Sequence, residues 1–436
     1  MTAMTKMSSK RAFPAAPRPA GRWRAVLRPA ALAAAALAAC AGCSVGAAAG
    51  PAPTASVAQV PSSSIVISPT GAARPSATGS PAASDPPASS CTQRVYNSLT
   101  EAQRVGQLFL VGLTPDAATS SAVAAIDNFH FGSVLLTTSA AGVPALATAT
   151  AGIQALATAQ ATGGVKFLIA ANQEGGQIQQ LTGTGFATMP SELRQGQLPL
   201  ATLRADTQVW GSELKAAGVN LDLAPVMDVV PQSNAANNAP IGQLDREFGY
   251  DPVTNGTHGA AYIEGMAQAG VATTAKHFPG LGQVRGNTDF TSGVTDTVTT
   301  VNAPDLGSFQ SAINAGVPFV MVALALYTQI DPTHFAVFSP VVIQQMLRQR
   351  MGFKGVIMTD DIGEAAQVQA IPAGRRATDF LNAGGDLITS QVVGPAETMA
   401  ADVLADANSS PSFRAVVAAA VMKVLAAKQA LGLLPC

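Results

Sequence analysis

The chain has 436 residues and a formal net charge of -1; 48% of its residues are apolar and 12% are charged. This composition excludes the strongly basic surface typical of nucleic-acid binding, so we expect no nucleic-acid partner. The apolar content is sufficient for a large folded core. The cysteines and histidines are too few and too scattered to form a ligand set, so we expect no metal and no cofactor.

Residues 1–39 have the features of a secretory signal peptide. Positions 6–28 contain seven Lys or Arg and no acidic residue, and the apolar run PAALAAAALAAC at 29–40 is too short to span a bilayer. Its end, L-A-A-C, matches a bacterial lipobox and predicts cleavage before Cys40 and lipid attachment there. Cys43 is the weaker alternative, because Cys40 would then occupy the leucine position; an ordinary cleaved signal is the other. We therefore expect an exported protein, anchored by lipid to the outer face of the cell membrane.

Residues 40–90 are expected to form an extended tether that follows the anchor. The segment after Cys43 is composed mainly of Ala, Pro, Ser, Thr and Gly, and it has too little large apolar surface to build a core. The folded domain is then 91–436, with Cys91 as its first residue and Cys436 as its last. In an oxidising exported compartment, such a pair predicts a disulfide that joins the two ends of the domain.

Within the folded domain, short apolar runs alternate with longer stretches of helical character. Such runs predict a parallel sheet that is covered by helices on both faces. Eight repeats in about 340 residues predict an α/β fold of the (β/α)8 TIM-barrel type, with an open doubly wound sheet as the alternative. We expect strands in 106–113, 132–138, 166–171, 219–226, 272–278, 319–324, 355–361 and 386–390, and helices in 141–160, 204–217, 254–269, 304–315, 339–350 and 374–383.

The barrel prediction also locates the site, because active sites of this fold lie at the C-terminal ends of the strands. Charged and amide side chains are gathered there, although the sequence is otherwise poor in charge. They are Asn172 and Glu174 after the third run, Asp228 after the fourth, Lys276 and His277 at the end of the fifth, and Asp360 and Asp361 at the end of the seventh.

Five motifs resemble, in order and spacing, the signatures of glycoside hydrolase family 3. They are NQEGGQIQQL at 172–181, LAPVMDV at 223–229, REFGYDP at 246–252, KHFPGLG at 276–282 and GFKGVIMTDD at 352–361. The sequence is similar to the single-barrel β-N-acetylglucosaminidases of peptidoglycan recycling, and especially to their actinobacterial lipoprotein members. The resemblance implies that the substrate is a muropeptide or another cell-wall glycan fragment. We expect the protein to be a monomer.

The resemblance also implies roles for individual residues. Asp360, the first aspartate of GVIMTDD, matches the nucleophile, while Lys276 and His277 match a pair that hydrogen-bonds sugar hydroxyls. Arg246 and Asn172 occupy two further sugar-binding positions. A retaining glycosidase needs a carboxylate below the anomeric carbon and an acid above the leaving oxygen. Lys276, if close to Asp360, would keep the nucleophile ionised.

The loop after KHFPG departs from the family pattern. In related enzymes the acid/base is a His–Asp dyad, but here Leu281 replaces one histidine and the D-S-H position reads Asn287-Thr288-Asp289. One hypothesis is that Asp289 acts as the acid/base, with a pKa raised by burial or by Asp360. The other is that the loop is a flexible lid, and that the protein cleaves weakly or only binds glycan.

Further departures concern the sugar. Asn172 replaces an aspartate that holds a sugar hydroxyl, and a histidine is lost near Leu324; two arginines are replaced by Gln177 and Gln180. The expected activity is that of a β-N-acetylglucosaminidase. A β-glucosidase or another β-hexosidase is the alternative among enzymes, and a glycan-binding lipoprotein is the non-catalytic alternative. We interpret Asp228 and Asp361 as structural residues that hydrogen-bond loop backbone.

Overall fold

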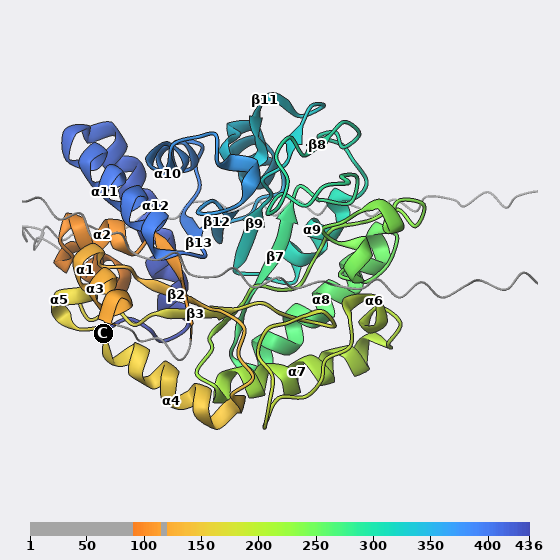
Figure 1. Cartoon of the computed structure of the whole chain (residues 1–436), viewed down its shortest axis with the longest axis horizontal. Helices are drawn as coiled ribbons and strands as arrows, with labels where there is room; N and C mark the ends of the chain where they lie inside the picture. Colours follow the sequence, from red (N-terminus) through yellow and green to blue (C-terminus); the bar gives the residue numbers. More distant parts are fainter. Residues whose placement is uncertain (1–89, 115–119) are drawn as a thin grey trace, which may run out of the picture. The chain divides into compact units, whose positions relative to one another are not determined.

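The computed structural model of the chain describes residues 90–114 and 120–436. The expected signal peptide, the expected anchor Cys40 and residues 41–89 of the expected tether lie outside the described residues. Two short helices, α1 (Cys91–Ser98) and α2 (Glu101–Gly106), precede the first strand (Figure 1). None of the helices in the described ranges is both long and apolar enough to cross a bilayer.

Eight parallel strands close into a barrel, so the predicted (β/α)8 fold is confirmed (Figure 1). Each barrel strand pairs with the next one along the chain, and the last pairs with the first, which excludes the open doubly wound sheet. All eight predicted runs contain a barrel strand. The strands are β1 (Phe109–Leu113), β2 (Ser133–Leu136), β3 (Leu168–Ala171), β6 (Leu221–Asp222), β7 (Ala272–Phe278), β9 (Phe319–Val322), β12 (Val356–Asp361) and β13 (Leu387–Ser390).

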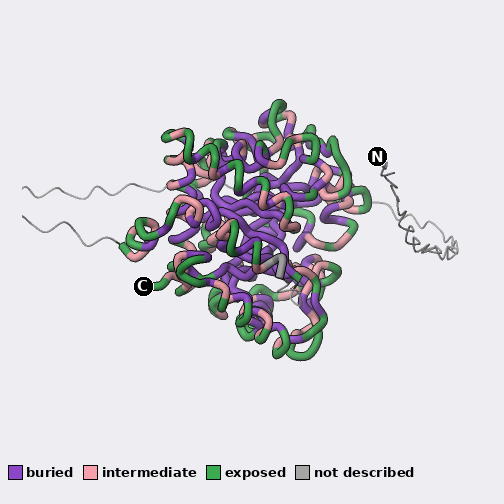
Figure 2. The backbone as a smooth tube through the Cα atoms, turned by 60° about the vertical axis from the view of Figure 1, so that its left-hand side comes forward, coloured by how far each residue is buried: buried purple, intermediate pink, exposed green. Residues whose placement is uncertain are grey.

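The barrel strands are buried on both faces, because their inner side chains fill the barrel and their outer side chains pack against helices. For this reason the strands read as continuous apolar runs, such as FLVGL in β1, rather than as alternating patterns. Buried residues occupy the centre of the fold, and exposed residues lie at its periphery (Figure 2). Phe109, Phe167 and Phe319 are among the large side chains that fill this core.

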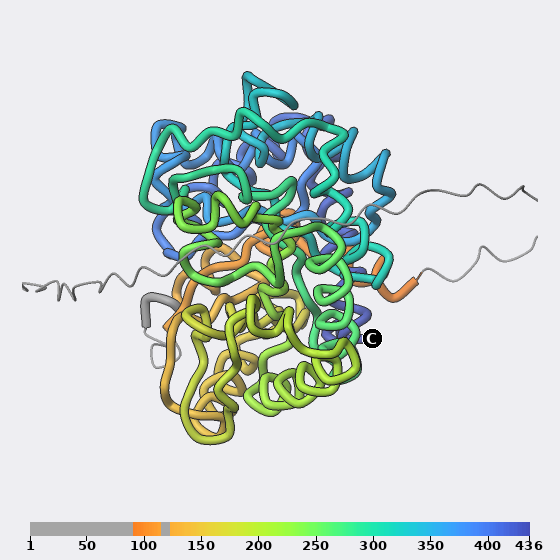
Figure 3. The backbone as a smooth tube through the Cα atoms, turned by 90° about the vertical axis from the view of Figure 1, so that its right-hand side faces the viewer, coloured from red at the N-terminus to blue at the C-terminus, as the bar shows by residue number. Residues whose placement is uncertain are grey.

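Helices connect the strands and cover the outside of the barrel; in Figure 3 the segments drawn yellow to light green and those drawn teal to blue lie on opposite sides. Helix α8 shows how the sequence sets both ends, because Asp251 accepts hydrogen bonds from the first turn and Gly270, with a φ of 76°, ends the helix. The helices are α3 (Ser120–Phe129), α4 (Gly142–Ala155), α5 (Ala159–Thr162), α6 (Glu192–Gln195), α7 (Leu200–Ala216), α8 (Pro252–Ala269), α9 (Leu306–Asn314), η4 (Val341–Arg350), α10 (Ala373–Asn382), α11 (Val393–Ser409) and α12 (Pro411–Ala430).

The two ends of the domain are joined. Helix α12 packs on α1 and α2 beside the start of the barrel (Figure 1). A disulfide links Cys91, the first residue of α1, to Cys436. Next to it, the backbone N–H of Thr92 donates to Oε1 of Gln429 over 3.2 Å. The last residue of the domain therefore lies beside Cys91 after one circuit of the barrel.

Two small sheets were not predicted, and both belong to loops at the C-terminal ends of barrel strands. Strands β4 (Gln173–Gly175) and β5 (Ile178–Gln179) form a hairpin after β3. A three-stranded sheet joins β8 (Thr295–Asp296), β10 (Leu326–Tyr327) and β11 (Asp331–Phe335), and it draws together the loops that follow β7 and β9. These loops build the walls around the open end of the barrel.

Candidate active site

A cavity of about 280 Å³ opens at the C-terminal ends of the barrel strands. Its position agrees with the location predicted for an active site of this fold. The six predicted catalytic and sugar-binding side chains all line it: Asn172, Arg246, Lys276, His277, Asp289 and Asp360. The structure thus brings together residues that are spread over almost two hundred positions of the sequence.

A buried ion cluster is centred on Glu174, which the hairpin after β3 carries into the barrel mouth. The Glu174 carboxylate accepts two hydrogen bonds of 2.7 Å from Arg246 and one ion-pair contact of 2.5 Å from Lys276. Burial would raise the pKa of Glu174, but the two cations outweigh it and hold the pKa at about 2. Sequence reasoning gave Glu174 no role, and the structure makes it the group that fixes both cations.

The same cluster fixes Lys276. Its Nζ atom contacts Glu174 and donates to Oδ1 of Asn172 over 2.9 Å. A buried glutamate needs a cationic partner more strongly than a half-exposed aspartate does. Because Oδ1 of Asn172 is occupied by Lys276, its amide nitrogen remains to donate into the cavity, where an aspartate could only accept.

His277 is oriented by Asp228. Its Nδ1 atom lies 2.7 Å from Oδ2 of Asp228, which leaves Nε2 as the atom available to a ligand. The Oδ1 atom of Asp228 accepts the backbone N–H groups of His277 and Leu281 over 3.2 and 2.7 Å. Asp228 therefore hydrogen-bonds loop backbone, as interpreted from the sequence, and in addition sets the ring of a cavity residue.

The loop after β7 packs closely against the loop after β6, and this contact requires a glycine at position 282. A Cβ atom on Gly282 would stand 1.7 Å from the carbonyl oxygen of Val229, so a side chain cannot be accommodated there. The Asn238 amide donates to the carbonyls of Leu281 and Val284 over 2.7 and 2.8 Å. The glycine-rich KHFPGLG stretch is thus a fixed turn that leads toward Asp289.

The two aspartates at the end of β12 have different environments. Asp361 is buried, and its Oδ1 atom accepts the backbone N–H groups of Gly363 and Gln391 over 2.9 and 3.1 Å. Asp360 is half-buried in the cavity wall and accepts the backbone N–H of Asp361 over 2.8 Å. Asp361 therefore holds the loop, while Asp360 presents its carboxylate to the cavity.

Asp289 is the second carboxyl group of the cavity that can take part in chemistry. Its backbone N–H donates to Oδ1 of Asn287 over 2.9 Å, which closes a tight turn. Burial, and next the negative charge of Asp360, raise the pKa of Asp289 to about 6. A carboxyl group with such a pKa can donate a proton near neutral pH.

These features agree with one family. The Glycosyl hydrolase family 3 N terminal domain matches residues 100–426. This chain belongs to glycosyl hydrolase family 3. The match covers nearly the whole of the described barrel, including every strand end that lines the cavity.

Proteins of known structure resemble the chain over its folded part. The β-N-acetylhexosaminidase from Beutenbergia cavernae DSM 12333 is 47% identical, with a TM-score of 0.74, over 76% of this chain and 99% of that one. A family 3 β-N-acetylglucosaminidase from Paenibacillus sp. str. FPU-7 is 28% identical, with a TM-score of 0.69, over 77% of this chain and 63% of that one.

Sequence comparison gives relatives of the same kind. A β-hexosaminidase from Xanthomonas oryzae pv. oryzae (strain KACC10331 / KXO85) is 38% identical over 229 residues. The matched part is 51% of this chain and 66% of that relative. This chain therefore aligns with just under two thirds of the length of that protein.

The family 3 departures noted in the sequence have different places in the structure. Leu281 and Gln180 line the cavity, whereas Gln177 is exposed and Leu324 is buried in the core. The cavity therefore has an apolar wall at Leu281. Of the described residues, no group of three or more His, Cys, Asp or Glu is arranged to hold a metal ion.

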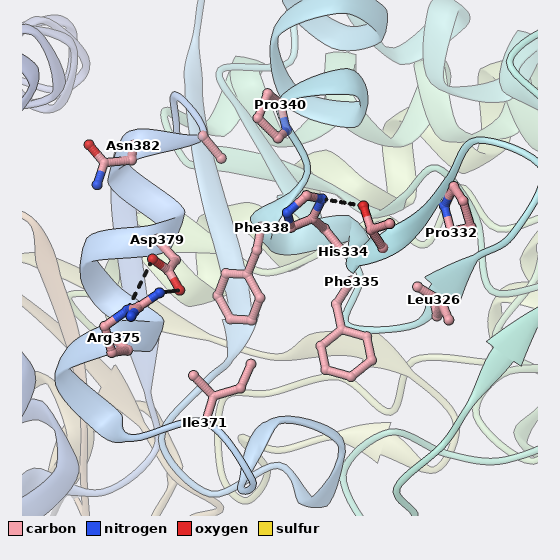
Figure 4. A pocket seen from close by; sticks show the side chains of 12 residues that line it. Leu326, Pro332, His334, Phe335, Phe338, Pro340, Ile371, Arg375, Asp379 and Asn382 are labelled. Carbon is pink, nitrogen blue, oxygen red and sulfur yellow. Dashed lines mark hydrogen bonds and ion pairs between the residues drawn. The ribbon is translucent and has the colours of Figure 1, made fainter.

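A second cavity of about 430 Å³ lies between the β11 region and α10 (Figure 4). It is lined by none of the predicted site residues. Its charged side chains Arg375 and Asp379 pair with each other over 3.2 Å, and the ring of His334 contacts Thr333 over 2.9 Å (Figure 4). The smaller cavity at the barrel mouth is the better candidate for chemistry, because it contains a carboxyl group with a raised pKa, that of Asp289.

Proposed function

We propose that the protein is a retaining β-N-acetylglucosaminidase that removes terminal β-linked N-acetylglucosamine from cell-wall glycan fragments or muropeptides. The observation that carries this proposal is the pair of carboxyl groups in one cavity, Asp360 and Asp289. The charge of Asp360 contributes to the raised pKa of Asp289, so the two groups lie close enough to interact. The relatives named above are β-hexosaminidases, which supports the choice of sugar.

In the first step, Asp360 attacks the anomeric carbon while Asp289 gives its proton to the leaving oxygen. The bond from carbon to the leaving oxygen breaks as the ester bond to Asp360 forms. Esterification removes the negative charge of Asp360, so one cause of the raised pKa of Asp289 disappears. The pKa of Asp289 therefore falls, so the group that has just given up its proton stays ionised and is available as the base.

In the second step, Asp289 takes a proton from water, and the water oxygen attacks the anomeric carbon and releases Asp360. Two inversions at the same carbon leave the product with the β configuration. The proton taken from water restores Asp289 to its acid form. Each group therefore returns to its starting state after one turnover.

The ion cluster and His277 supply the sugar-binding groups. Arg246, Lys276 and the amide of Asn172 form a donor-rich wall that suits sugar hydroxyls, and Glu174 holds the two cations in place. His277 adds its Nε2 atom from the next position on β7. Groups fixed in this way lose little freedom when the sugar binds.

We also propose that the protein is exported and lipid-anchored at Cys40, with Cys43 as the alternative attachment point, and that it acts as a monomer. The support is the signal-like composition of residues 1–39 and the L-A-A-C ending. Cys40→Ala should release the protein from the membrane fraction of producing cells. Continued membrane retention of this variant would transfer the role to Cys43 or to another anchor.

The proposed activity is tested by incubating the purified protein with a panel of nitrophenyl β-glycosides and with muropeptides. We expect turnover of N-acetylglucosaminides, with the product released in the β configuration as seen by NMR at early times. Faster turnover of the β-glucoside than of the N-acetylglucosaminide would support a β-glucosidase instead. Binding of glycan without turnover of any substrate would support a glycan-binding protein and overturn the proposal.

A further inference from the structure

We propose that Gln367 is a positioning residue, which fixes the loop of the acid/base Asp289 to the segment that follows the nucleophile Asp360. Gln367 lies in a short 3-10 helix, η5 (Ala366–Val368), seven residues after Asp360. It is absent from the cavity lining and belongs to none of the five sequence motifs. The inference rests on the proposed role of Asp289, and the experiment below separates the two.

Backbone hydrogen bonds attach the acid loop to η5 at the acid itself. The N–H of Gln367 donates to the carbonyl of Thr288 over 3.1 Å, and the N–H of Ala366 donates to the carbonyl of Asp289 over 3.1 Å. The backbone of the residue that carries the acid is therefore tied directly to the nucleophile's segment.

The side chain of Gln367 attaches the same loop a second time, a few residues further on. Its Nε2 atom donates to the carbonyl of Val294 over 2.9 Å, and its Oε1 atom accepts the N–H of Val294 over 2.9 Å. Gln367 as a whole residue is only 3% exposed, so water competes little for these bonds. Together with the backbone bonds, they hold the loop on both sides of Phe290.

The segment that bears Gln367 is itself connected to the nucleophile. Asp361, next to Asp360, accepts the N–H groups of Gly363 and Glu364. The amide of Gln369 donates to the carbonyls of Gly363 and Ala365 over 3.0 and 3.2 Å, which closes this turn. A continuous set of hydrogen bonds therefore runs from the end of β12 through η5 to Asp289.

These hydrogen bonds fix the separation of the Asp289 and Asp360 carboxyl groups, on which the reaction depends. Retaining glycosidases need their two carboxyl groups about 5–5.5 Å apart, and small misplacement of a catalytic group slows reaction strongly. The bonds at positions 288, 289 and 294 also oppose the hypothesis of a flexible lid. Loss of the Gln367 side-chain bonds should let the acid move away from Asp360 and toward solvent.

The test compares Gln367→Met with Gln154→Met in the full-length protein. Methionine has nearly the shape of glutamine but cannot make these hydrogen bonds. Gln154 is a matched control, because its amide makes the same two-way contact with Phe167, through Nε2 to the carbonyl at 2.9 Å and from the N–H to Oε1 at 3.0 Å. Phe167 directly precedes β3, at the end of the barrel opposite the cavity.

The measurement is kcat/KM for a series of β-N-acetylglucosaminides with leaving groups of increasing pKa. Gln367→Met should slow substrates with sugar leaving groups by about 10–100-fold, as expected for a partly misplaced acid, and dinitrophenyl substrates by less than about 3-fold. The alkaline limb of its pH profile should move to lower pH, because burial and Asp360 raise the pKa of Asp289 and both effects weaken. Gln154→Met should lower the melting temperature, but it should change neither the leaving-group dependence nor the pH profile.

Two further variants make the outcome decisive. Gln367→Asn keeps the amide but shortens its reach, and it should show the same changes in smaller measure; it replaces the methionine variant if that one does not fold. Asp289→Ala should make the leaving-group dependence steeper than any Gln367 variant does. Suppose that Asp289→Ala has this effect. If the Gln367 variants then slow all substrates equally, or slow none of them, the positioning role is wrong. If Asp289→Ala itself has no such effect, the acid assignment fails instead.

Discussion

Arg246 donates two hydrogen bonds of 2.7 Å to Glu174, from Nε to Oε2 and from Nη2 to Oε1. The pair joins the loop after β6 to the hairpin after β3 at the mouth of the barrel. Lys276 adds a second cation to the same carboxylate. The donor-rich wall of the cavity is therefore built around one buried acid.

Glu174→Gln should destabilise the protein by about 3–5 kcal/mol, because it leaves two buried cations without their counter-charge. Urea unfolding followed by circular dichroism measures the change in the free energy of unfolding. The matched control is Glu264→Gln, which breaks the exposed ion pair with Arg204 and should cost at most about 1 kcal/mol. Equal effects of the two substitutions would contradict a central role of Glu174.

Asp360 should form the covalent glycosyl-enzyme. A mechanism-based fluorosugar inhibitor should label its side chain, and peptide mass spectrometry identifies the labelled residue. Asp360→Asn should lose nearly all turnover with little change in fold, because the two side chains have almost the same shape. The neighbouring Asp361 accepts hydrogen bonds from backbone and should remain unlabelled; a label there would reverse the assignment.

Asp289 should limit activity at alkaline pH. Its protonated form is the acid, and its pKa is raised to about 6, so kcat/KM for natural glycan should fall about tenfold for each pH unit above that value. A dinitrophenyl substrate, whose leaving group needs no proton, should show a flatter profile. An equally steep decline for both substrates would point to a group other than the acid.

Removal of Asp289 should separate the two chemical steps. Asp289→Ala should slow cleavage of natural glycan by about 10²–10⁴-fold, as for a lost general acid. With a dinitrophenyl substrate the intermediate should still form and then persist, because no base activates water. Added azide, which needs no base, should restore turnover and yield the β-glycosyl azide, identified by NMR. Turnover of natural glycan within a few-fold of wild type would disprove the role.

Glu247 should make stability depend on pH. Both of its carboxyl oxygens lack a hydrogen-bond partner among the described residues, and burial raises its pKa from 4.5 to about 7. As pH rises from about 4.5 to 7, the unfolded chain releases this proton and the folded chain retains it, so the free energy of unfolding falls. Glu247→Gln should remove this loss, and its melting temperature relative to wild type should rise between pH 5 and pH 8. A difference that is constant with pH would contradict the raised pKa.

The barrel could be predicted because each strand is an apolar run that is buried on both faces. Predictions of strand ends were less accurate, as β6 shows. The apolar pattern continues through 219–226, but the strand is only Leu221–Asp222, and Pro225, which follows shortly, has no N–H to donate to a neighbouring strand. The run predicted as a helix at 339–350 is helical, but it is wound as a π-helix, which hydrophobic periodicity does not distinguish.

Residues that line the cavity could be predicted where a motif carried them, and their partners could not. The partner of Lys276 depends on how the β4–β5 hairpin turns Glu174 inward, and the sheet of β8, β10 and β11 lacks the alternating pattern of a regular strand. Gln367 and Val294 are 73 positions apart, and neither has a neighbour in sequence that signals the contact. Long-range hydrogen bonds of this kind follow from the fold and not from local composition.

The disulfide prediction has its own measurement. Mass spectrometry of the non-reduced protein should show a linked pair of peptides that contain Cys91 and Cys436. In the chain-entropy model, the closed loop of this length stabilises the fold by about 5 kcal/mol, and measured values are often smaller. Cys91→Ser together with Cys436→Ser should therefore lower the melting temperature, and two free thiols in protein from an oxidising host would contradict the bond.

The same bond makes the domain a covalent ring. A protease that cuts the backbone once anywhere between residues 91 and 436 opens the ring but releases no fragment, because the disulfide still joins the two pieces. Each piece retains the other as a tethered partner, so the cut strands and helices can reassemble without a search through solution. A single cut that would divide an open chain therefore leaves this domain in one covalently linked piece.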